Sequence, residues 1–414
     1  MAATAPSLHD AVDEILPGLV ADRRHLHEHP ELGMQEYETA KFVADRLWQL
    51  GLEDIRTGIA NTGVTALIRG TNPDGPGAGK VVLLRADMDA LPIAEENDVE
   101  YRSQNDGFMH ACGHDAHTTV LLGVSRILMG RRGEFAGTVK VLFQPCEEQP
   151  PGGAKFMIEQ GALEDPHVDA AFGLHVAPDT PVGQVKVLAG PVSAASDTFH
   201  VEIQGRGGHG AYPHRTVDPV LVGARIISAL QSLVSRETDP LERAVITVGS
   251  LHAGEADNVV PDTATLAGTV RTFSEATRAH FARRIPEVVT GVAEAMRATA
   301  TIDYQPGYPS MVNDATMADL VRRAATDVLG EDNVLPGTPM MGVEDMAYYF
   351  QRVPGAFFNL GVGNEARGIT AGVHHPRFDL DETALAVGVE VMTTVALRWF
   401  EEAASAGNEG GPER

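Results

Sequence analysis

The sequence contains little cysteine, little positive charge and no long apolar run. Only two of its 414 residues are cysteines, which excludes the disulfide framework of a small secreted protein. Lysine and arginine total 32 against 57 acidic residues, and the net charge of −25 repels nucleic acid backbones and anionic lipid surfaces. No apolar segment is long enough to span a bilayer. We therefore expect neither a nucleic acid partner nor a membrane partner.

The first twenty residues lack the features of a secretory signal. They include Asp10, Asp13 and Glu14, where a signal has a basic start followed by an apolar core. Both cysteines, Cys112 and Cys146, stand among other potential metal ligands, and a disulfide would remove their thiolates from such a site. These observations predict a reducing, cytoplasmic location.

The length of the chain predicts two domains, because a single hydrophobic core usually stops growing below this size. Apolar strands alternate with helices over residues 1–188 and 310–414, which predicts an α/β domain with a mixed sheet covered by helices. Residues 189–309 have the order β-α-β-β-α-β of a ferredoxin-like unit. We expect this unit to be a separate domain inserted into the first.

Three segments of the first domain have specific local signals. Pro17 within the first amphipathic pattern predicts a kinked or split helix. Two aliphatic runs, 64–69 and 81–85, flank a turn rich in proline and glycine and predict a hairpin. The tail over residues 401–414 shows no periodicity and is expected to be frayed.

The densest group of chemically active side chains lies at residues 109–117. A thiol and three imidazoles fall within eight residues there, and these are ligand types that zinc and similar metals prefer. Gly113 allows the backbone to turn so that Cys112 and His114 can point at one centre. The alternative is a helix start with scattered histidines.

Further ligand types follow the ends of predicted strands. Glu147 and Glu148 are neighbours, so one carboxylate can bind a metal while the other reaches a metal-bound water. His175 closes a strand over 170–174, and His374 lies in a loop near the end of the chain. Each of these residues alone is more typical of a solvated or structural position, but four such groups together favour a metal site.

Asp87 and Asp89 lie two residues apart after the strand over 81–84, so their carboxylates point the same way. Either one can orient a ligand imidazole through its second nitrogen. Pairing with Arg85 or capping of the next turn explains them equally well.

Other polar residues have weaker signals. His209 lies in a glycine-rich loop over 205–210, and the glycines would let it reach a neighbour. Asn258 and Arg271 are donors that could hold a carboxylate, although surface residues of these types usually have no such role. Glu344 could hold a substrate ammonium.

Taken together, the motifs resemble the dinuclear-metal aminoacylase/carboxypeptidase family. The resemblance is to the branch of N-acyl-amino-acid amidohydrolases, hippurate hydrolases and auxin-conjugate (indoleacetyl-amino-acid) hydrolases, and it spans almost the whole chain. The matching segments are residues 26–31, 85–92, 110–115, 144–148, 173–175, 207–209, 342–345 and 374–376.

The resemblance implies roles for most of these residues. It implies that Glu147 is a general base, that His209 steadies the substrate carbonyl, commonly across a dimer interface, and that Asn258 and Arg271 lie near the substrate carboxylate. Residues 1–188 and 310–414 would be the catalytic, metal-binding domain, and 189–309 the lid and dimerisation domain of a homodimer or higher homo-oligomer. The implied ligands of two divalent metal ions are Cys112, His114, Glu148, His175 and His374.

The predicted function is metal-dependent hydrolysis of N-acyl amino acids to a carboxylic acid and a free amino acid. The alternatives are a dipeptidase or carboxypeptidase of the same family, with Glu344 holding the ammonium, and a non-catalytic metal- or ligand-binding protein. Glu147 argues against the last, because a structural site needs no additional carboxylate. Zinc suits a thiolate and imidazole site best, and manganese, cobalt and nickel are alternatives. The sequence leaves open the acyl group, the amino acid, and the roles of Cys146 and His375, where the branch usually has other residues.

Overall fold

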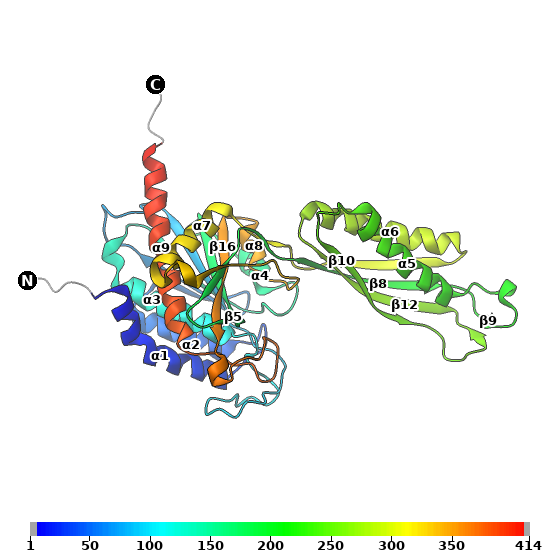
Figure 1. Ribbon diagram of the computed structural model, residues 1–414, viewed down its shortest axis with the longest axis horizontal. Helices are drawn as coiled ribbons and strands as arrows, with labels where there is room; N and C mark the ends of the chain where they lie inside the picture. Colours follow the sequence, from blue (N-terminus) through cyan, green and yellow to red (C-terminus); the bar gives the residue numbers. More distant parts are fainter. Residues whose placement is uncertain (1–5, 410–414) are drawn as a thin grey trace, which may run out of the picture. The chain divides into compact units, whose positions relative to one another are not determined.

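A computed structural model of the protein describes residues 6–409, which divide into two compact units (Figure 1). The first unit contains the chain up to Gly190, then Val312–Thr338, then the chain from Tyr348 onward. The second unit contains Pro191–Met311 and Pro339–Ala347. The boundaries expected from the sequence gave the short segment 339–347 to the first domain, and in the structure it groups with the second unit.

The first unit is built on an eight-stranded mixed sheet. Its strands, in order across the sheet, are β1 (Glu53–Ile59), β2 (Gly63–Arg69), β4 (Thr138–Gln144), β3 (Val81–Asp87), β5 (Ala170–Pro181), β16 (Gly355–Gly363), β6 (Val185–Val187) and β15 (Val334–Pro336). The central strands β4, β3, β5 and β16 run parallel to one another. The helices are α1 (Leu8–Glu28), α2 (Tyr37–Leu50), α3 (His114–Gly130), α4 (Gly153–Glu159), α7 (Ala315–Leu329), α8 (Ala347–Phe350) and α9 (Ala384–Glu409).

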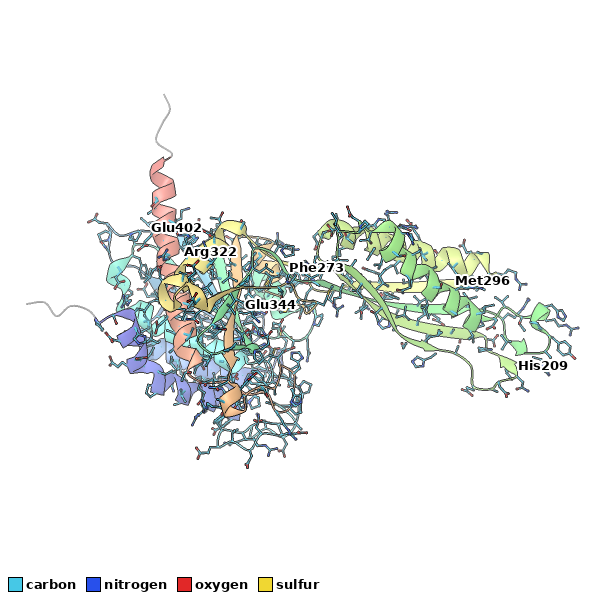
Figure 2. The ribbon with its side chains drawn as sticks, in the orientation of Figure 1. His209, Phe273, Met296, Arg322, Glu344 and Glu402 are labelled. Atoms are coloured by element: carbon cyan, nitrogen blue, oxygen red, sulfur yellow. The ribbon has the colours of Figure 1, made fainter. Side chains whose placement is uncertain are left out.

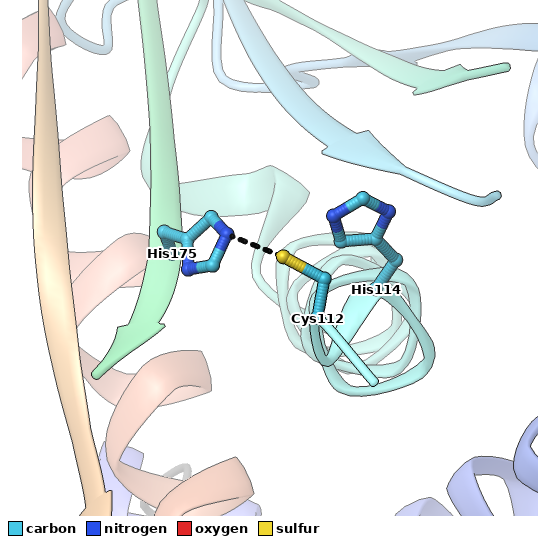
Figure 3. A group of neighbouring side chains, drawn as sticks. All are labelled: Cys112, His114 and His175. Atoms are coloured by element: carbon cyan, nitrogen blue, oxygen red, sulfur yellow. Dashed lines mark hydrogen bonds between the residues drawn. The ribbon is translucent and has the colours of Figure 1, made fainter. Parts of the chain in front are cut away.

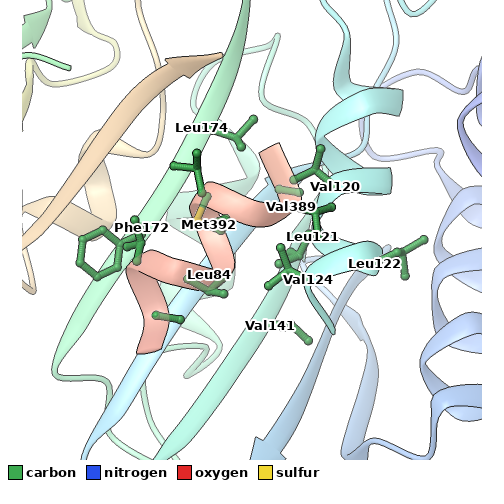
Figure 4. Packing of buried hydrophobic residues seen from close by; sticks show 14 of the residues in the cluster. Leu84, Val120, Leu121, Leu122, Val124, Val141, Phe172, Leu174, Val389 and Met392 are labelled. Atoms are coloured by element: carbon green, nitrogen blue, oxygen red, sulfur yellow. The ribbon is translucent and has the colours of Figure 1, made fainter. Parts of the chain in front are cut away.

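Helices cover both faces of the central sheet. All seven residues of β3 are buried, as expected of a parallel strand with helices on both sides. Figure 4 shows how the apolar face of α3, with Val120 and Val124 one turn apart, packs beside Val389 and Met392 of α9 and against Leu84 of β3. This packing fixes the start of α3 close to the ends of the central strands.

Three local predictions for this unit are wrong in whole or in part. The runs 64–69 and 81–85 do not form a hairpin, because β4 lies between β2 and β3 and pairs with both. The connection from β3 to β4 passes through α3, which is the crossover that a parallel pair requires. Helix α1 is not split at Pro17, because buried side chains on both sides of the proline offset its missing hydrogen bond, and a kink there stays a prediction. Residues 401–409 continue α9, because alanine and glutamate favour a helix; residues 410–414 lie outside the described part.

The second unit has the predicted ferredoxin-like topology. Its elements are β8 (Ala195–Gln204), α5 (Pro219–Glu237), β10 (Ala244–His252), β12 (Thr263–Thr272), α6 (Glu275–Ala295) and β13 (Thr299–Pro306), and the antiparallel sheet has the order β10-β12-β8-β13. Alternate residues of β8, such as Phe199 and Val201, are buried against Ile226 of α5 and Phe281 of α6. The prediction of a βαββαβ unit is therefore confirmed.

Short strands complete the structure. In the second unit, β9 (Gly208–His209) pairs with β11 (Val259–Val260) beyond the end of the main sheet. The strands β7 (Gly190–Ser193) and β14 (Met311–Asn313) lie in sequence where the chain passes between the units. Within residues 6–409 no helix is both long enough and apolar enough to cross a membrane.

Candidate metal centre

Three neighbouring parallel strands bring carboxylates and an imidazole to one edge of the sheet. Asp87 ends β3, and Glu147 and Glu148 follow the end of β4. The parallel register of β3 and β5 places His175 level with Asp87. In open α/β sheets, this carboxyl-terminal edge is where ligands usually bind.

The start of α3 brings Cys112 and His114 to the same edge. Between them, Gly113 has a φ of 85°, and a Cβ atom at this position would lie 2.5 Å from Cγ2 of Val176. Only glycine tolerates both the conformation and the close approach. Figure 3 shows Cys112 between His114 and His175, with 3.4 Å separating the Cys112 Sγ and the His175 Nε2. The tight turn thus brings a thiol and an imidazole at the start of α3 close to an imidazole of β5.

Glu148 connects this group to His374. The Oε1 atom of Glu148 lies 3.2 Å from Nε2 of His374 and 3.9 Å from Nε2 of His114. The ligand atoms in each of three overlapping groups lie within 4.8 Å of one another. These groups are Cys112 with His114 and His175, Cys112 with Glu148 and His374, and His114 with Glu147 and Glu148. The structure therefore brings together all five predicted ligands and the predicted base.

Two atoms in the cluster fit a metal cation better than they fit their present surroundings. Nε2 of His114 and Oε1 of Glu148 are buried and make no hydrogen bond of good geometry among the described residues, although Oε1 lies 3.2 Å from Nε2 of His374. A buried polar atom without a partner costs roughly 1–3 kcal/mol, and coordination of a cation would remove that cost. The mixture of thiol, imidazole and carboxylate suits zinc and related divalent ions.

Asp89 holds the backbone on which both glutamates lie. Its two carboxylate oxygens accept hydrogen bonds from the backbone N–H groups of Glu147 and Glu148, each at 3.0 Å. One of them also lies 3.2 Å from Nδ1 of His114, which leaves Nε2 of that ring directed at the cluster. Asp89 therefore has the geometry predicted for a residue that orients a ligand imidazole.

Asp87 contacts a histidine that was not among the predicted site residues. Nδ1 of His117 donates to Asp87 at 2.6 Å, and its Nε2 accepts the N–H of Val176 at 2.9 Å. The carbonyl of Val176 in turn accepts from Nδ1 of His175 at 2.8 Å. His117 thus holds Val176, the residue whose carbonyl orients His175. Its position one helical turn after His114 is the sequence signal that could have identified it.

The pKa of the Asp87 carboxyl and the pKa of the Cys112 thiol are shifted in opposite directions. Burial opposes a charge on Asp87, but His114, Arg85 and His117 overcome this effect and hold the pKa of its carboxyl well below the ordinary value. The Arg85 guanidinium lies 2.6 Å from Asp87, so the alternative of a pair with Arg85 is also present in the structure. Burial raises the pKa of the Cys112 thiol well above its ordinary value, so without a cation this thiol stays protonated.

All four predicted substrate-contacting residues lie in the second unit, and three of them belong to its larger segment, Pro191–Met311. His209 is exposed on β9, as Figure 2 shows, and the next residue, Gly210, donates its N–H to the carbonyl of Asn258 at 2.8 Å. His209 and Asn258 are therefore neighbours. Arg271 is the penultimate residue of β12, whereas β11 precedes the start of that strand. About eight residues of strand, or roughly 26 Å, separate Arg271 from that start, so within one copy of the unit it cannot share a ligand group with Asn258.

The remaining residues of interest have local partners. Glu344 is only 5% exposed and accepts the N–H of Met346 at 2.9 Å, which closes a turn. Nδ1 of His375 accepts the N–H of Arg377, and the Cys146 thiol faces the carbonyl of Gln149 at 3.7 Å. The predicted contact of Glu344 with a substrate remains a prediction.

The α/β fold with its inserted unit, together with the ligand cluster at the sheet edge, defines a metal-dependent amide hydrolase. The model of peptidase family M20/M25/M40 matches residues 83–398, and the chain belongs to this family.

Relatives and solved structures match nearly the full chain. The IAA-amino acid hydrolase ILR1-like 4 of Arabidopsis thaliana is 41% identical over 388 residues, which cover 93% of this chain and 86% of the relative. The N-acetyl-L-cysteine deacetylase of Bacillus subtilis (strain 168) is 41% identical over 367 residues, which cover 89% and 84%. The crystal structure of the Bacillus subtilis YXEP protein, a dinuclear metal binding peptidase from the M20 family, superposes with a TM-score of 0.81 at 37% identity and covers 94% of this chain and 99% of that one.

Proposed function

We propose that this protein is a two-metal amidohydrolase that cleaves N-acyl amino acids to a carboxylic acid and a free amino acid. The observation that carries the proposal is the position of Glu147, whose carboxylate lies within 4.8 Å of ligand atoms of His114 and Glu148 in the cluster. A carboxylate beside a set of metal ligands is what hydrolysis by an activated water requires. The names of the plant hydrolase and the cysteine deacetylase support an acylated amino acid as the substrate.

Two divalent cations would be held by the five predicted ligands. When bound, the cations supply Lewis acidity, which acidifies water and polarises the substrate carbonyl. The description of the YXEP protein as dinuclear supports the number of ions. Zinc is the best match to the donor set, with manganese, cobalt and nickel as alternatives. The ligands are Cys112, His114, Glu148, His175 and His374.

Glu147 performs the proton transfers in this proposal. Its backbone is fixed by Asp89, and the residue is only 7% exposed, so its carboxylate acts in a largely dry position. The carboxylate takes a proton from water as the water oxygen attacks the acyl carbon. It then gives that proton to the amide nitrogen as the C–N bond breaks, which releases the amino acid.

The second unit supplies the remaining substrate contacts. The exposed imidazole of His209 would donate to the carbonyl oxygen as negative charge develops on it. Asn258, its neighbour, would hold the substrate carboxylate, and Arg271 would act on a carboxylate only at the other end of the unit. The lid and dimerisation roles of this unit, a homodimer or higher homo-oligomer, and a cytoplasmic location are part of the proposal.

A dipeptidase or carboxypeptidase activity is the second candidate function. The description of the YXEP protein as a peptidase favours it, and Glu344 could then hold the substrate ammonium. The buried position of Glu344 and its bond to the Met346 backbone favour the acyl substrate instead. Membership in a hydrolase family removes the non-catalytic alternative.

Substrate competition separates the two functions. Metal-stripped protein would be refilled with zinc, manganese, cobalt or nickel and assayed on N-acetyl and N-benzoyl amino acids beside dipeptides with the same C-terminal residue. We expect kcat/KM for the best acyl substrate to exceed that for its dipeptide by about 10-fold or more, because an unpaired ammonium is costly to bury. Faster hydrolysis of the dipeptides would contradict the acyl-amino-acid assignment and favour the peptidase.

A further inference from the structure

We propose that helix α1 carries an additional site for a borderline divalent cation such as zinc, formed by His25, Glu28 and His29. One ligand atom from each of these three side chains lies within 4.8 Å of the other two. None of the three is buried, so an ion can reach them from solvent. None belongs to the metal centre at the sheet edge, so the site does not depend on the proposed hydrolase function.

Helical spacing places the three side chains on one face. Glu28 follows His25 by three residues and His29 follows it by four, and both separations bring side chains together on a helix. The centroids of the two imidazole rings are 4.6 Å apart. Zinc–nitrogen bonds are about 2.0–2.1 Å long, so two ligand atoms of one ion lie up to about 4 Å apart. Small rotamer adjustments would therefore bring the three ligand atoms to coordination distance.

His29 is already oriented as a ligand. Its Nδ1 lies 2.8 Å from the backbone carbonyl of His25, and a carbonyl can only accept, so Nδ1 carries the proton. The Nε2 atom then has the lone pair that a metal needs. This hydrogen bond also satisfies a carbonyl in the last turn of α1, where His29 is the C-cap.

His25 is also restrained before any ion binds. Its ring packs against the ring of Phe42 on α2, with 4.8 Å between centroids. A side chain that is already ordered loses less entropy on binding. Burial and the nearby His29 both lower the pKa of His25, which favours the neutral imidazole that a metal requires.

The surroundings of the site attract cations. His25 and His29 line a cavity of about 360 Å³ together with the carboxylates of Glu31, Glu38 and Asp45. Three carboxylates beside two imidazoles give a negative local potential. Lys41 is the opposing charge in the cavity wall, and it lies 3.8 Å from Glu38.

The histidine between the two ligands does not take part. His27 lies on the opposite face of α1, is only 1% exposed, and has its Nδ1 2.7 Å from Asp115. His27 therefore faces the core of the first unit, whereas His25 and His29 lie on the side of α1 that faces away from the core. A cation bound to the outward pair would stabilise the end of α1 and leave turnover unchanged.

Zinc counting on the full chain tests the proposal. Metal-stripped protein would be dialysed against micromolar free zinc and its zinc content measured for the parent and for His25→Gln. This substitution removes one imidazole but keeps the backbone carbonyl to which His29 donates. His167→Gln is a matched control, because His167 is an exposed imidazole 3.1 Å from a carboxylate three residues away, without a second imidazole in that pair.

We expect the parent and His167→Gln to hold one more zinc per chain than His25→Gln. The test compares the zinc content of the parent with that of the variant. It therefore gives an answer even if the metal centre takes up fewer ions than proposed. Glu28→Gln is a second variant, and it should show weaker binding of the same zinc. Equal zinc contents in the parent and His25→Gln would overturn the proposal, and so would the loss of more than one zinc.

Discussion

His117 and Asp89 hold the proposed metal ligands in place through hydrogen bonds. Asp89 binds two consecutive backbone N–H groups and one ring, and His117 links Asp87 to the peptide after His175. Both side chains are almost fully buried, so their hydrogen bonds are not exchanged with solvent. The cluster therefore depends on groups that do not themselves coordinate.

Replacement of His117 should weaken metal binding without removing any ligand. For His117→Ala we expect zinc affinity to fall by about 10- to 100-fold, because Val176, whose carbonyl orients His175, loses its hydrogen bond to His117. His117→Gln, which keeps a donor and an acceptor, should recover part of the loss. Competition with a chromogenic chelator measures both affinities, and a parent-like affinity in His117→Ala would contradict the role given to His117.

Glu36 gives the metal-free protein a pH-dependent stability. Burial raises the pKa of this carboxyl from near 4.5 to about 7, against the opposing hydrogen bond from Thr62. The folded state thus binds the proton more tightly than the unfolded state, and the free energy of unfolding falls as pH rises from about 4.5 to about 7. We expect the parent to lose roughly 2–3 kcal/mol relative to Glu36→Gln over this range.

Urea unfolding of the two metal-free proteins at mildly acidic and mildly alkaline pH measures this change. The glutamine variant keeps an oxygen for the N–H of Cys146 and an amide near Thr62 but cannot titrate. A difference in stability between parent and variant that does not change with pH would show that Glu36 has an ordinary pKa.

Chemistry identified the metal cluster from the sequence, but the positions of its supporting residues depend on the fold. Cys112, His114 and the glutamates were recognisable because ligand types are rare at such density. His117 belongs to the same run, yet its contacts with Asp87 and Val176 arise only from the pairing of β3 with β5. The separation of Arg271 from Asn258 within one unit has a different origin, because it follows from the length of the single strand β12.

At the scale of elements, the start of α3 is the part of the fold on which the cluster depends most. Gly113 has a left-handed backbone next to Val176, and it separates two proposed ligands by one residue. The buried helix that follows is fixed by the core shown in Figure 4. The positions of the proposed ligands at the start of α3 therefore depend on the packing along the whole length of that helix.

Gly113→Ala should damage both stability and metal binding. We expect the free energy of unfolding to fall by about 2 kcal/mol or more, from the unfavourable φ and the contact with Val176. Gly130→Ala is the matched control at the other end of α3, where an added Cβ meets nothing within 4 Å, and it should be neutral or stabilising. Denaturant unfolding and zinc content measure the effects, and equal behaviour of the two variants would contradict this account.

The periodicity of apolar residues in the sequence predicts most helices and strands, but it does not predict the order of the strands in the first sheet. The helices and strands of the ferredoxin-like unit were predictable because each amphipathic pattern is unambiguous and neighbouring elements pair locally. The prediction of a hairpin formed by β2 and β3 was wrong because β4 lies between these strands in the sheet. Strand β4 begins more than fifty residues after the end of β3. Single-strand patterns carry no information on such a nonlocal partner.

At the scale of the whole molecule, each unit has a hydrophobic core of its own. The second unit buries Phe199, Ile226 and Phe281 between its sheet and its two helices. A unit with its own core can fold alone. This independence suits a domain that is inserted into the sequence of another domain.

The fragment Pro191–Met311 should fold in isolation. We expect a cooperative thermal transition by circular dichroism, because the complete four-stranded sheet and both helices lie within it. Phe199→Ala in the same fragment should lower the free energy of unfolding by about 3–5 kcal/mol through loss of a fully buried ring. A fragment without a cooperative transition would show that its core depends on the rest of the chain.

The central claim is that Glu147 transfers protons beside a metal site made by its neighbours. Its most direct test is the turnover of an N-acetyl amino acid by Glu147→Gln, measured together with metal content. We expect the variant to keep the metal content of the parent while kcat falls by about 10²- to 10⁴-fold. A variant that retains both its metal and the turnover of the parent would contradict the claim.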